Sequence, residues 1–257
     1  IYGAGRFSTK ITNTSTGSAA IYTNGFDYSR IEGMYISLHE DSTRACISLD
    51  WDNTGSVALQ SNSFRDIYFE GGAFGLYIGE SGNMGSENLI ENCYFAGHTE
   101  AGLKTTNFNA LANTVIGGNF ASCKKGIYVA AGSVPIIHGV SFQNSTEADI
   151  YVENSAGDMY SIDGCRNESN LNDTTFAVFH SGASAHIAGC SLLSTLSNLT
   201  FGFIEAGSST AGPGVMTVDA CFGPYSKFSG NGELYIRGNP SYTFASTASW
   251  SAFSGNL

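Results

Sequence analysis

A six-residue pattern of apolar and polar positions recurs along most of the chain: apolar, any residue, Gly/Asn/Asp, apolar, any residue, apolar. It is clearest from Ile137 to Phe142, which reads IHGVSF. Eight segments follow or approximate the pattern, namely IEGMYI from Ile31, FRDIYF from Phe64, IENCYF from Ile90, VIGGNF from Val115, IHGVSF from Ile137, IDGCRN from Ile162, IAGCSL from Ile187 and VDACFG from Val218. Successive copies begin 22 to 33 residues apart. Such a period is typical of a solenoid, in which each repeat packs against its neighbours.

A shorter pattern, apolar-any-apolar and often led by Gly, falls between these copies. Its segments are CISL at Cys46, GLYI at Gly75, GLKT at Gly102, GIYV at Gly126, DIYV at Asp149 and ELYI at Glu233. Short alternations bounded by Gly, Asn and Ser indicate strands, and the spacing of apolar residues expected for a helix is absent. Each period therefore holds three short strands.

A bend is expected within the six-residue pattern, where the residue types accept a left-handed backbone at low cost. The residues assigned to it are Gly33, Asp66, Asn92, Gly118, Gly139, Gly164 and Gly189. The in/out alternation resets after the bend, so that Ile90, Cys93 and Phe95 all face inward from two strands. Three strands per coil with one tight corner predict an all-β fold, a right-handed parallel β-helix built as a single-stranded solenoid. No Leu/Asn ladder or Trp-Asp dipeptide favours a leucine-rich or propeller array.

The period weakens towards the C-terminus. We expect residues 1–222 to form the parallel β-helix and residues 223–257 to form a C-terminal cap or a subunit-contact segment, because the latter are rich in Ser, Ala and aromatic residues around one remaining strand. One elongated domain is expected, since a solenoid adds its core coil by coil.

The charge balance excludes several classes of partner. The 257 residues include 11 Lys plus Arg against 22 Asp plus Glu, a formal net charge of −11. Nucleic acid is therefore not expected, because neutralising phosphates requires basic patches. No apolar run approaches the roughly 20 residues that span a bilayer, so membrane insertion is not expected either.

Four of the six cysteines share one inward position after the bend. They are Cys93, Cys165, Cys190 and Cys221, in a column with Met34, Ile67 and Val140. Thiols in such a column are expected to act as small apolar core residues rather than as disulfides. No paired Cys-x-x-Cys or clustered His accompanies them, so neither a metal site nor a cofactor is predicted.

The N-terminal segment carries the sequence G-x-G-x-x-x-T-x-I at Gly3, Gly5, Thr9 and Ile11. It resembles the opening coil of pectate-lyase-like β-helices found in bacteriophage tailspikes and other polysaccharide-degrading proteins. The resemblance covers residues 1 to about 222 and is specific for the fold, whereas no active-site motif of the family is matched. It implies a bacterial surface polysaccharide as partner, a homotrimer, an upstream segment that attaches to the virion, and a location on the virion surface or outside the cell.

Two outward rows of side chains are expected on the strands. One reads Ser48, Tyr77, Lys104, Tyr128 and Tyr151, and the other reads Tyr35, Tyr68, Tyr94, Asn119 and Ser141. Tyr rings on a solvated sheet can stack against sugars while their hydroxyls form hydrogen bonds. Stacking of Tyr on Tyr across neighbouring strands is the alternative.

Candidate catalytic residues are Asp50, Asp52 and Glu80, which follow equivalent strands of adjacent coils. Glycoside hydrolysis requires two carboxyl groups that flank the scissile bond, although ordinary solvated turn carboxylates would look the same. The candidate substrate-binding residues are Trp51, Tyr77, Lys104, Tyr128 and Tyr151. A second acidic cluster, Asp149, Glu153 and Asp158, is expected around Tyr151.

These features predict a tailspike-like protein that binds and depolymerises a bacterial surface polysaccharide as a glycosidase. Two alternatives stay open at this point. In a uronate lyase or epimerase, Lys104 would abstract the C5 proton as a base with a lowered pKa. In a non-catalytic spike or adhesin, the β-helix would be a rigid spacer.

Overall fold

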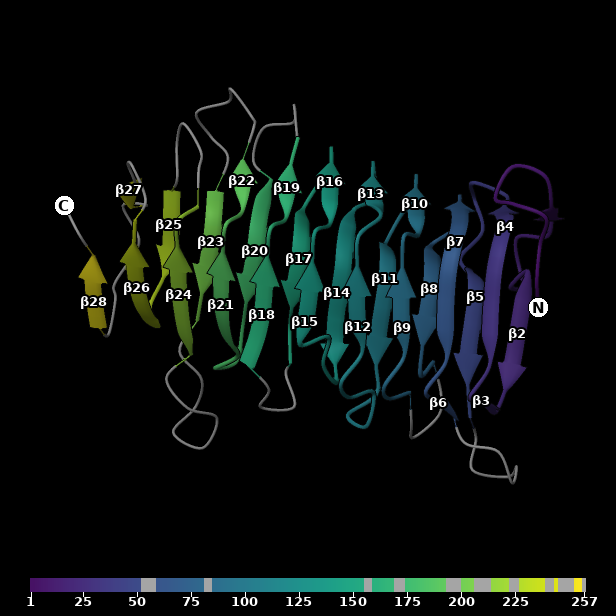
Figure 1. Ribbon diagram of the computed structural model, residues 1–257, viewed down its shortest axis with the longest axis horizontal. Helices are drawn as coiled ribbons and strands as arrows, with labels where there is room; N and C mark the ends of the chain where they lie inside the picture. The colour runs from purple at the N-terminus through teal and green to yellow at the C-terminus, as the bar shows by residue number, and fades with distance from the viewer. Residues whose placement is uncertain are drawn as a thin grey trace.

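The computed structural model describes residues 1–51, 59–80, 85–154, 159–168, 174–192, 200–205, 214–221, 227–238, 243–244 and 252–255. Its strands pair in parallel, and successive coils stack along the long axis of the molecule (Figure 1). The fold is an all-β, right-handed parallel β-helix, as the sequence predicted. Among the described residues no helix is long and apolar enough to cross a membrane.

A ten-stranded sheet forms one wall of the solenoid and contains the shorter sequence pattern. Its strands, in spatial order, are β2 (Ile21–Asn24), β5 (Ala45–Asp50), β8 (Phe74–Ile78), β11 (Ala101–Thr106), β14 (Lys125–Ala131), β17 (Ala148–Val152), β20 (Thr175–Phe179), β23 (Thr200–Ile204), β25 (Lys227–Gly230) and β27 (Thr243–Phe244). Each strand of this sheet belongs to a different coil, so residues in register lie one above the other along the axis.

A sixteen-stranded sheet forms the other two walls, which we name the first and second limbs. The long strands β4 (Arg30–Leu38) and β7 (Ser63–Glu70) span both limbs, and the bend divides the later coils into separate strands. The first limb contains β9 (Leu89–Glu91), β12 (Thr114–Ile116), β15 (Ile136–His138), β18 (Met159–Asp163), β21 (Ser184–Ala188), β24 (Val215–Asp219), β26 (Glu233–Arg237) and β28 (Ala252–Gly255). The second limb contains β1 (Lys10–Asn13), β10 (Tyr94–Ala96), β13 (Asn119–Ala121), β16 (Ser141–Gln143), β19 (Arg166–Asn167) and β22 (Ser191–Leu192). A separate pair consists of β3 (Phe26–Asp27) and β6 (Leu59–Gln60).

The corner between the two limbs is the bend predicted from the sequence. All seven residues assigned to it have a positive φ, between 51° and 83°. One assignment is wrong by a residue: Gly117, with φ of 63°, aligns with Asn92, and Gly118 follows it. Two consecutive glycines obscured the position in the sequence. The second is also required, because a Cβ at Gly118 would lie 2.2 Å from the carbonyl oxygen of Cys93.

The core of the first coils is a stack of phenylalanine rings facing a column of glycines. The rings of Phe69, Phe95, Phe120 and Phe142 have successive centroid separations of 4.7, 4.4 and 5.4 Å and are within 17° of parallel. The facing positions in the ten-stranded sheet are Gly75, Gly102 and Gly126. A Cβ at Gly102 would lie 2.4 Å from Cδ1 of Phe120. The two walls can therefore approach closely only where one side lacks a side chain.

The wall that carries the inward aromatic rings changes at a buried polar pair. Asp149 follows Gly126 in its column, and Asn167 follows Phe142 in the ring column. Both side chains are fully buried, and the Asn167 amide donates a hydrogen bond to an oxygen of the Asp149 carboxyl group. In the next coil Phe176 occupies the column that Gly126 and Asp149 share. The aromatic stack thus passes from the second limb to the ten-stranded sheet at this pair.

The cysteine column and an amide ladder also run along the axis. All six cysteines are buried thiols, and register places Cys165 beside Cys190, as predicted. A buried ladder of amides was not predicted: Asn62 Nδ2 donates to Asn88 Oδ1 at 3.0 Å, and Asn88 Nδ2 donates to Asn113 Oδ1 at 2.8 Å. The same amides bond to backbone carbonyls at the turn, so they satisfy backbone groups that the turn leaves without a strand partner.

Both large sheets continue beyond residue 222. β25 pairs with β23, and β26 pairs with β24 in parallel register. The described part of 223–257 therefore adds strands to the solenoid. A role for this segment as a cap or as a subunit contact stays a prediction.

Replacing Asp149 by Asn is expected to remove a pH dependence of stability. Burial raises the pKa of Asp149 from 3.8 to about 7, so the folded protein retains a proton that the unfolded chain has already lost. The contribution of Asp149 to stability is therefore most favourable below pH about 4, and stability falls as pH rises from there towards 7. The asparagine side chain of the variant keeps the hydrogen bond from Asn167 without a charge. Denaturant unfolding from acidic to mildly alkaline pH should show the variant more stable at neutral pH. Parallel pH profiles for the two proteins would contradict this account of Asp149.

Replacing Gly102 by Ala is expected to destabilise the fold by about 1–3 kcal/mol, because the added methyl group must displace the Phe120 ring. The matched control is Gly17→Ala, where an added Cβ meets no atom within 4 Å. Urea unfolding measures both. Equal stability of the two variants would show that the phenylalanine stack tolerates a side chain on the facing wall.

Candidate functional site

The outward row predicted on the ten-stranded sheet is present and longer than the sequence indicated. Ser48, Tyr77, Lys104, Tyr128 and Tyr151 lie in register on successive strands. The row begins one coil earlier and ends three coils later, with the additional members Tyr22, Val178, Phe203 and Ser229. We call the whole set the outward row. It runs along the solenoid axis on one wall.

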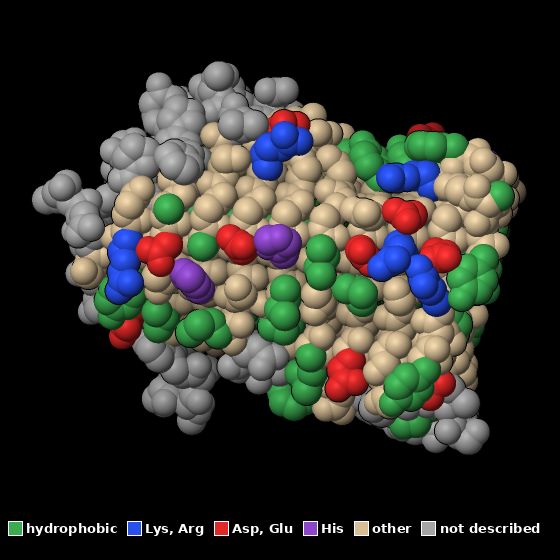
Figure 2. All heavy atoms as spheres, in the orientation of Figure 1, with side chains coloured by type: hydrophobic (Ala, Val, Ile, Leu, Met, Phe, Trp, Pro, Cys, Tyr) green, Lys and Arg blue, Asp and Glu red, His purple; other side chains and the backbone are tan. Residues whose placement is uncertain are grey.

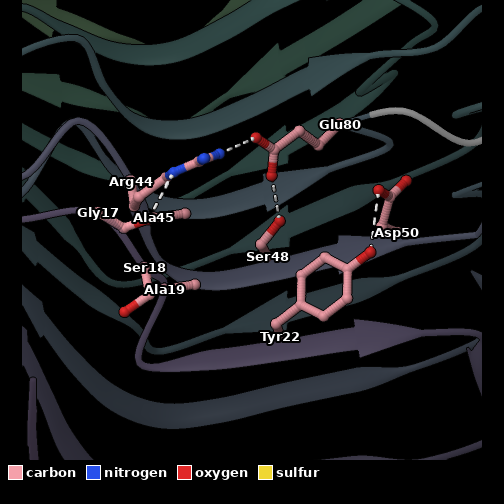
Figure 3. A pocket seen from close by; sticks show the side chains of 9 residues that line it. All are labelled: Gly17, Ser18, Ala19, Tyr22, Arg44, Ala45, Ser48, Asp50 and Glu80. Atoms are coloured by element: carbon pink, nitrogen blue, oxygen red, sulfur yellow. Dashed lines mark hydrogen bonds and ion pairs between the residues drawn. The ribbon is translucent and has the colours of Figure 1, made fainter.

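A pocket of about 380 Å³ lies at the N-terminal end of the outward row. Tyr22, Ser48 and Asp50 come from β2 and β5, Arg44 precedes β5, and Glu80 follows β8. Asp50 and Glu80, from adjacent coils, both line this pocket, and Figure 3 shows Glu80 directed towards Arg44 and Ser48 and Asp50 directed towards Tyr22. We name it the Asp50–Glu80 pocket.

Hydrogen bonds hold both carboxylates of this pocket in place. Glu80 accepts from Arg44 Nη1 at 2.9 Å and from Ser48 Oγ at 2.7 Å (Figure 3). Asp50 is 3% exposed and accepts from Tyr22 Oη at 3.4 Å and from the backbone N–H of Trp51 at 2.9 Å. Arg44 is itself fixed by a bond from Nε to the Gly17 carbonyl, 3.1 Å long. The pocket thus presents two oriented carboxylates beside one guanidinium.

The structure does not bring Trp51 into this pocket, and Asp52 lies outside the described residues. Trp51 is partly buried and packs against the hydrophobic core, and it is not among the residues that line the pocket. Conversely, Arg44 and Tyr22 line the pocket and were missed. The alternation IYT at Ile21 was a usable signal for Tyr22, whereas Arg44 lies in a turn whose path the sequence does not indicate.

Lys104 lies in an aromatic cage next along the row. Its Nζ is 4.6 Å from the ring centroid of Phe74, 5.0 Å from that of Tyr77 and 5.2 Å from that of Tyr128. Burial lowers the pKa of Lys104, while the neighbouring charge of Glu100 opposes the effect. The cage stabilises the cation by cation–π attraction and at the same time removes water from it.

Tyr128 and Tyr151 continue the row beside a second lysine. Lys125 Nζ lies 4.8 Å from the Tyr128 centroid and 4.7 Å from the Tyr151 centroid, and it forms a 2.9 Å ion pair with Glu147. The Tyr128 hydroxyl donates to Glu153. Burial raises the pKa of Tyr128, and the bond to Glu153 adds to the effect.

The second acidic cluster predicted around Tyr151 is not formed as expected. The prediction that Asp149 belongs to this cluster is wrong, because its side chain points into the core and is fully buried. Its place in the column of Gly75, Gly102 and Gly126 is an inward one, and a glycine gives no indication of direction in the sequence. Glu153 does lie on the outer surface beside Tyr128, and Asp158 lies outside the described residues.

The second Tyr row has fewer exposed ring faces against which a sugar could stack. Tyr35, Tyr68 and Tyr94 stack with centroid separations of 5.0 and 4.6 Å and interplanar angles of 16° and 12°. Their faces are therefore occupied by one another. In the outward row, by contrast, Tyr128 and Tyr151 meet at 82°. The rings of the outward row are therefore not stacked face to face, and the lysines Lys104 and Lys125 lie over Tyr128.

The outer face of the first limb carries charges instead. His138 Nδ1 lies 3.1 Å from Asp163 Oδ2, and His186 Nε2 lies 3.1 Å from Asp219 Oδ2. Figure 2 shows a band of acidic, basic and histidine side chains along the long axis of the face in view. Over the described ranges, no group of three or more His, Cys, Asp and Glu is placed to hold a metal ion.

The chain matches no protein-family model, and comparisons with curated proteins and with solved structures gave no significant match.

Replacing Phe74 by Ala is expected to raise the pKa of Lys104 towards its ordinary value. Burial lowers this pKa more than any other contribution changes it, so readmitting water outweighs the loss of one cation–π contact. NMR titration of the Lys104 ε-methylene measures the effect, with Phe108→Ala as the control because Phe108 is 67% exposed. A pKa that falls further in Phe74→Ala would show that cation–π attraction dominates.

Proposed function

We propose that the ten-stranded wall binds a bacterial surface polysaccharide and that the Asp50–Glu80 pocket hydrolyses it. The observation that carries the proposal is that two carboxylates from adjacent coils line one pocket at the end of a row of tyrosines. Such a row supplies apolar ring faces for sugar C–H groups and hydroxyls for their polar edges. The two carboxyl groups supply the pair that glycoside hydrolysis requires.

Within this proposal the two carboxylates have different tasks. Glu80 accepts from the charged Arg44 guanidinium and from Ser48, which suits an ionised group acting as base or nucleophile. The Tyr22 hydroxyl and the Trp51 backbone N–H, which donate to Asp50, are by contrast neutral. Asp50 would then protonate the glycosidic oxygen as it leaves. Tyr22 donates to Asp50 and would orient its carboxyl group. The chemistry requires no metal or cofactor.

The wider assignment is to the phage tailspike type, as a homotrimer with an upstream virion-attachment segment on the virion surface or outside the cell. Its support is the N-terminal sequence resemblance at Gly3, Gly5, Thr9 and Ile11, together with the β-helix fold. The net charge of −11 does not favour nucleic acid as the partner.

A second candidate function is elimination at a uronate polysaccharide, by a lyase or an epimerase. The lowered pKa of Lys104 favours it, because a lysine abstracts a proton only in its neutral form. The positions of Tyr77 and Tyr128 on either side of Lys104 would place a sugar ring over the amine. Arg44 is held by Glu80 and by Gly17, so it does not assist at Lys104.

Substitutions in the pocket distinguish these functions. Asp50→Asn and Glu80→Gln should each reduce the release of reducing ends from capsular polysaccharides and lipopolysaccharides by about 100-fold or more, with binding retained. The matched control is Glu91→Gln, since Glu91 is also paired with an arginine, Arg65, but lies on the first limb. Lys104→Gln should weaken binding and leave hydrolysis at saturation nearly unchanged.

Three outcomes would contradict hydrolysis in the pocket. An unsaturated product with ultraviolet absorbance, lost in Lys104→Gln, would identify a lyase. Unchanged release in Asp50→Asn and Glu80→Gln would place the chemistry elsewhere. Binding without any release by the wild type would assign the chain to the non-catalytic spikes or adhesins.

A further inference from the structure

A second pocket lies at the opposite end of the outward row. Its volume is about 320 Å³, and its wall includes Tyr151, Val178 and Phe203 from three successive strands, with His180 at the end of β20. Small-molecule sites typically begin at about this size, with an apolar lining and a few polar groups. We name it the Tyr151–Phe203 pocket.

The rings of this pocket are tilted rather than stacked. The centroids of Tyr151 and His180 are 5.3 Å apart at 49°, and those of His180 and Phe203 are 5.0 Å apart at 49°. The His180 ring is fixed, because its Nδ1 lies 3.0 Å from Glu205 Oε2. This hydrogen bond also lowers the pKa of Glu205. Tilted, anchored rings leave faces that a pyranose ring can cover with its C–H groups.

The rim of the pocket is polar. Glu147, Thr175 and Ser229 supply hydrogen-bonding groups around the aromatic walls, and Glu147 is held by Lys125 at 2.9 Å. An apolar floor with hydroxyl and carboxylate groups at its edge matches the two faces of a sugar: C–H groups on one side and hydroxyls around the ring. The chemical class that fits is therefore an uncharged pyranose unit.

The two pockets share one wall and one register. From Ser48 the row passes through Tyr77, Lys104, Tyr128 and Tyr151 to Val178. These five steps between strands correspond to about 24 Å along the axis. A single extended polymer can therefore contact both pockets only if it runs parallel to the solenoid axis.

We propose that the Tyr151–Phe203 pocket is a second saccharide subsite, which holds a distal unit of the same polysaccharide whose reacting bond lies in the Asp50–Glu80 pocket. This inference rests on the proposed function. Its consequence is a dependence of affinity on chain length, because only oligosaccharides that span about 24 Å reach the second pocket. Shorter fragments bind at the Asp50–Glu80 pocket alone.

The test uses a partial hydrolysate of whichever capsular polysaccharide or lipopolysaccharide glycan binds the wild type, separated by size. Phe203→Leu removes a ring from the Tyr151–Phe203 pocket, and Thr175→Arg obstructs its rim from a different strand. Each variant should bind long fragments about fivefold to tenfold more weakly than the wild type and bind the shortest fragments with unchanged affinity. The control is Met159→Ala, since Met159 is 63% exposed on the first limb. Thermal unfolding of each variant checks that the fold is intact.

Two results separate this inference from the proposal on which it rests. If long fragments bind Phe203→Leu and Thr175→Arg as tightly as the wild type, the second subsite is wrong and the Asp50–Glu80 pocket is unaffected. An equal loss of affinity for short and long fragments would likewise show that the Tyr151–Phe203 pocket does not hold a distal unit of the polysaccharide. If no glycan of the panel binds the wild type, the proposed function fails, and the inference fails with it.

Discussion

The contact of a phenylalanine ring with the bare backbone of a glycine on the facing wall determines the cross-section of the first coils. Gly75 and Gly102 let the ten-stranded sheet approach Phe95 and Phe120 so closely that no Cβ fits between them. With the inward positions occupied in this way, a slip of one residue would turn every ring to the solvent. The register of the outward row, and with it both pockets, is a consequence of this inward packing.

Much of the fold was predictable because it repeats. A residue type that recurs at one position in successive coils, such as the glycines Gly139, Gly164 and Gly189 at the bend, reports a backbone requirement that a single occurrence would not. The prediction was less accurate where side-chain information is missing. Two consecutive glycines concealed which one forms the bend, and the column containing Gly126 gave no sign that Asp149 points inward.

The site was predictable only as far as strands determine it. Asp50 and Glu80 flank equivalent strands of neighbouring coils, so their proximity follows from the repeat. Arg44, which holds Glu80, belongs to a turn of variable length, and its direction depends on contacts with the Gly17 carbonyl that no periodicity encodes. Trp51 shows the converse, since a residue adjacent to a site residue in sequence packs against the core.

The inward aromatic rings move from one wall to the other at Asp149 and Asn167. The chain therefore contains two kinds of coil, and one kind cannot replace the other. Before the exchange a ring projects from the second limb, and after it Phe176 and Phe201 project from the opposite wall. Duplicating or deleting a coil within either group keeps the rings of that group on one wall. Moving a coil from one group to the other would place inward rings on facing walls of neighbouring coils, where they would compete for the same space. Growth of this solenoid by recombination is therefore confined to either side of one buried polar pair.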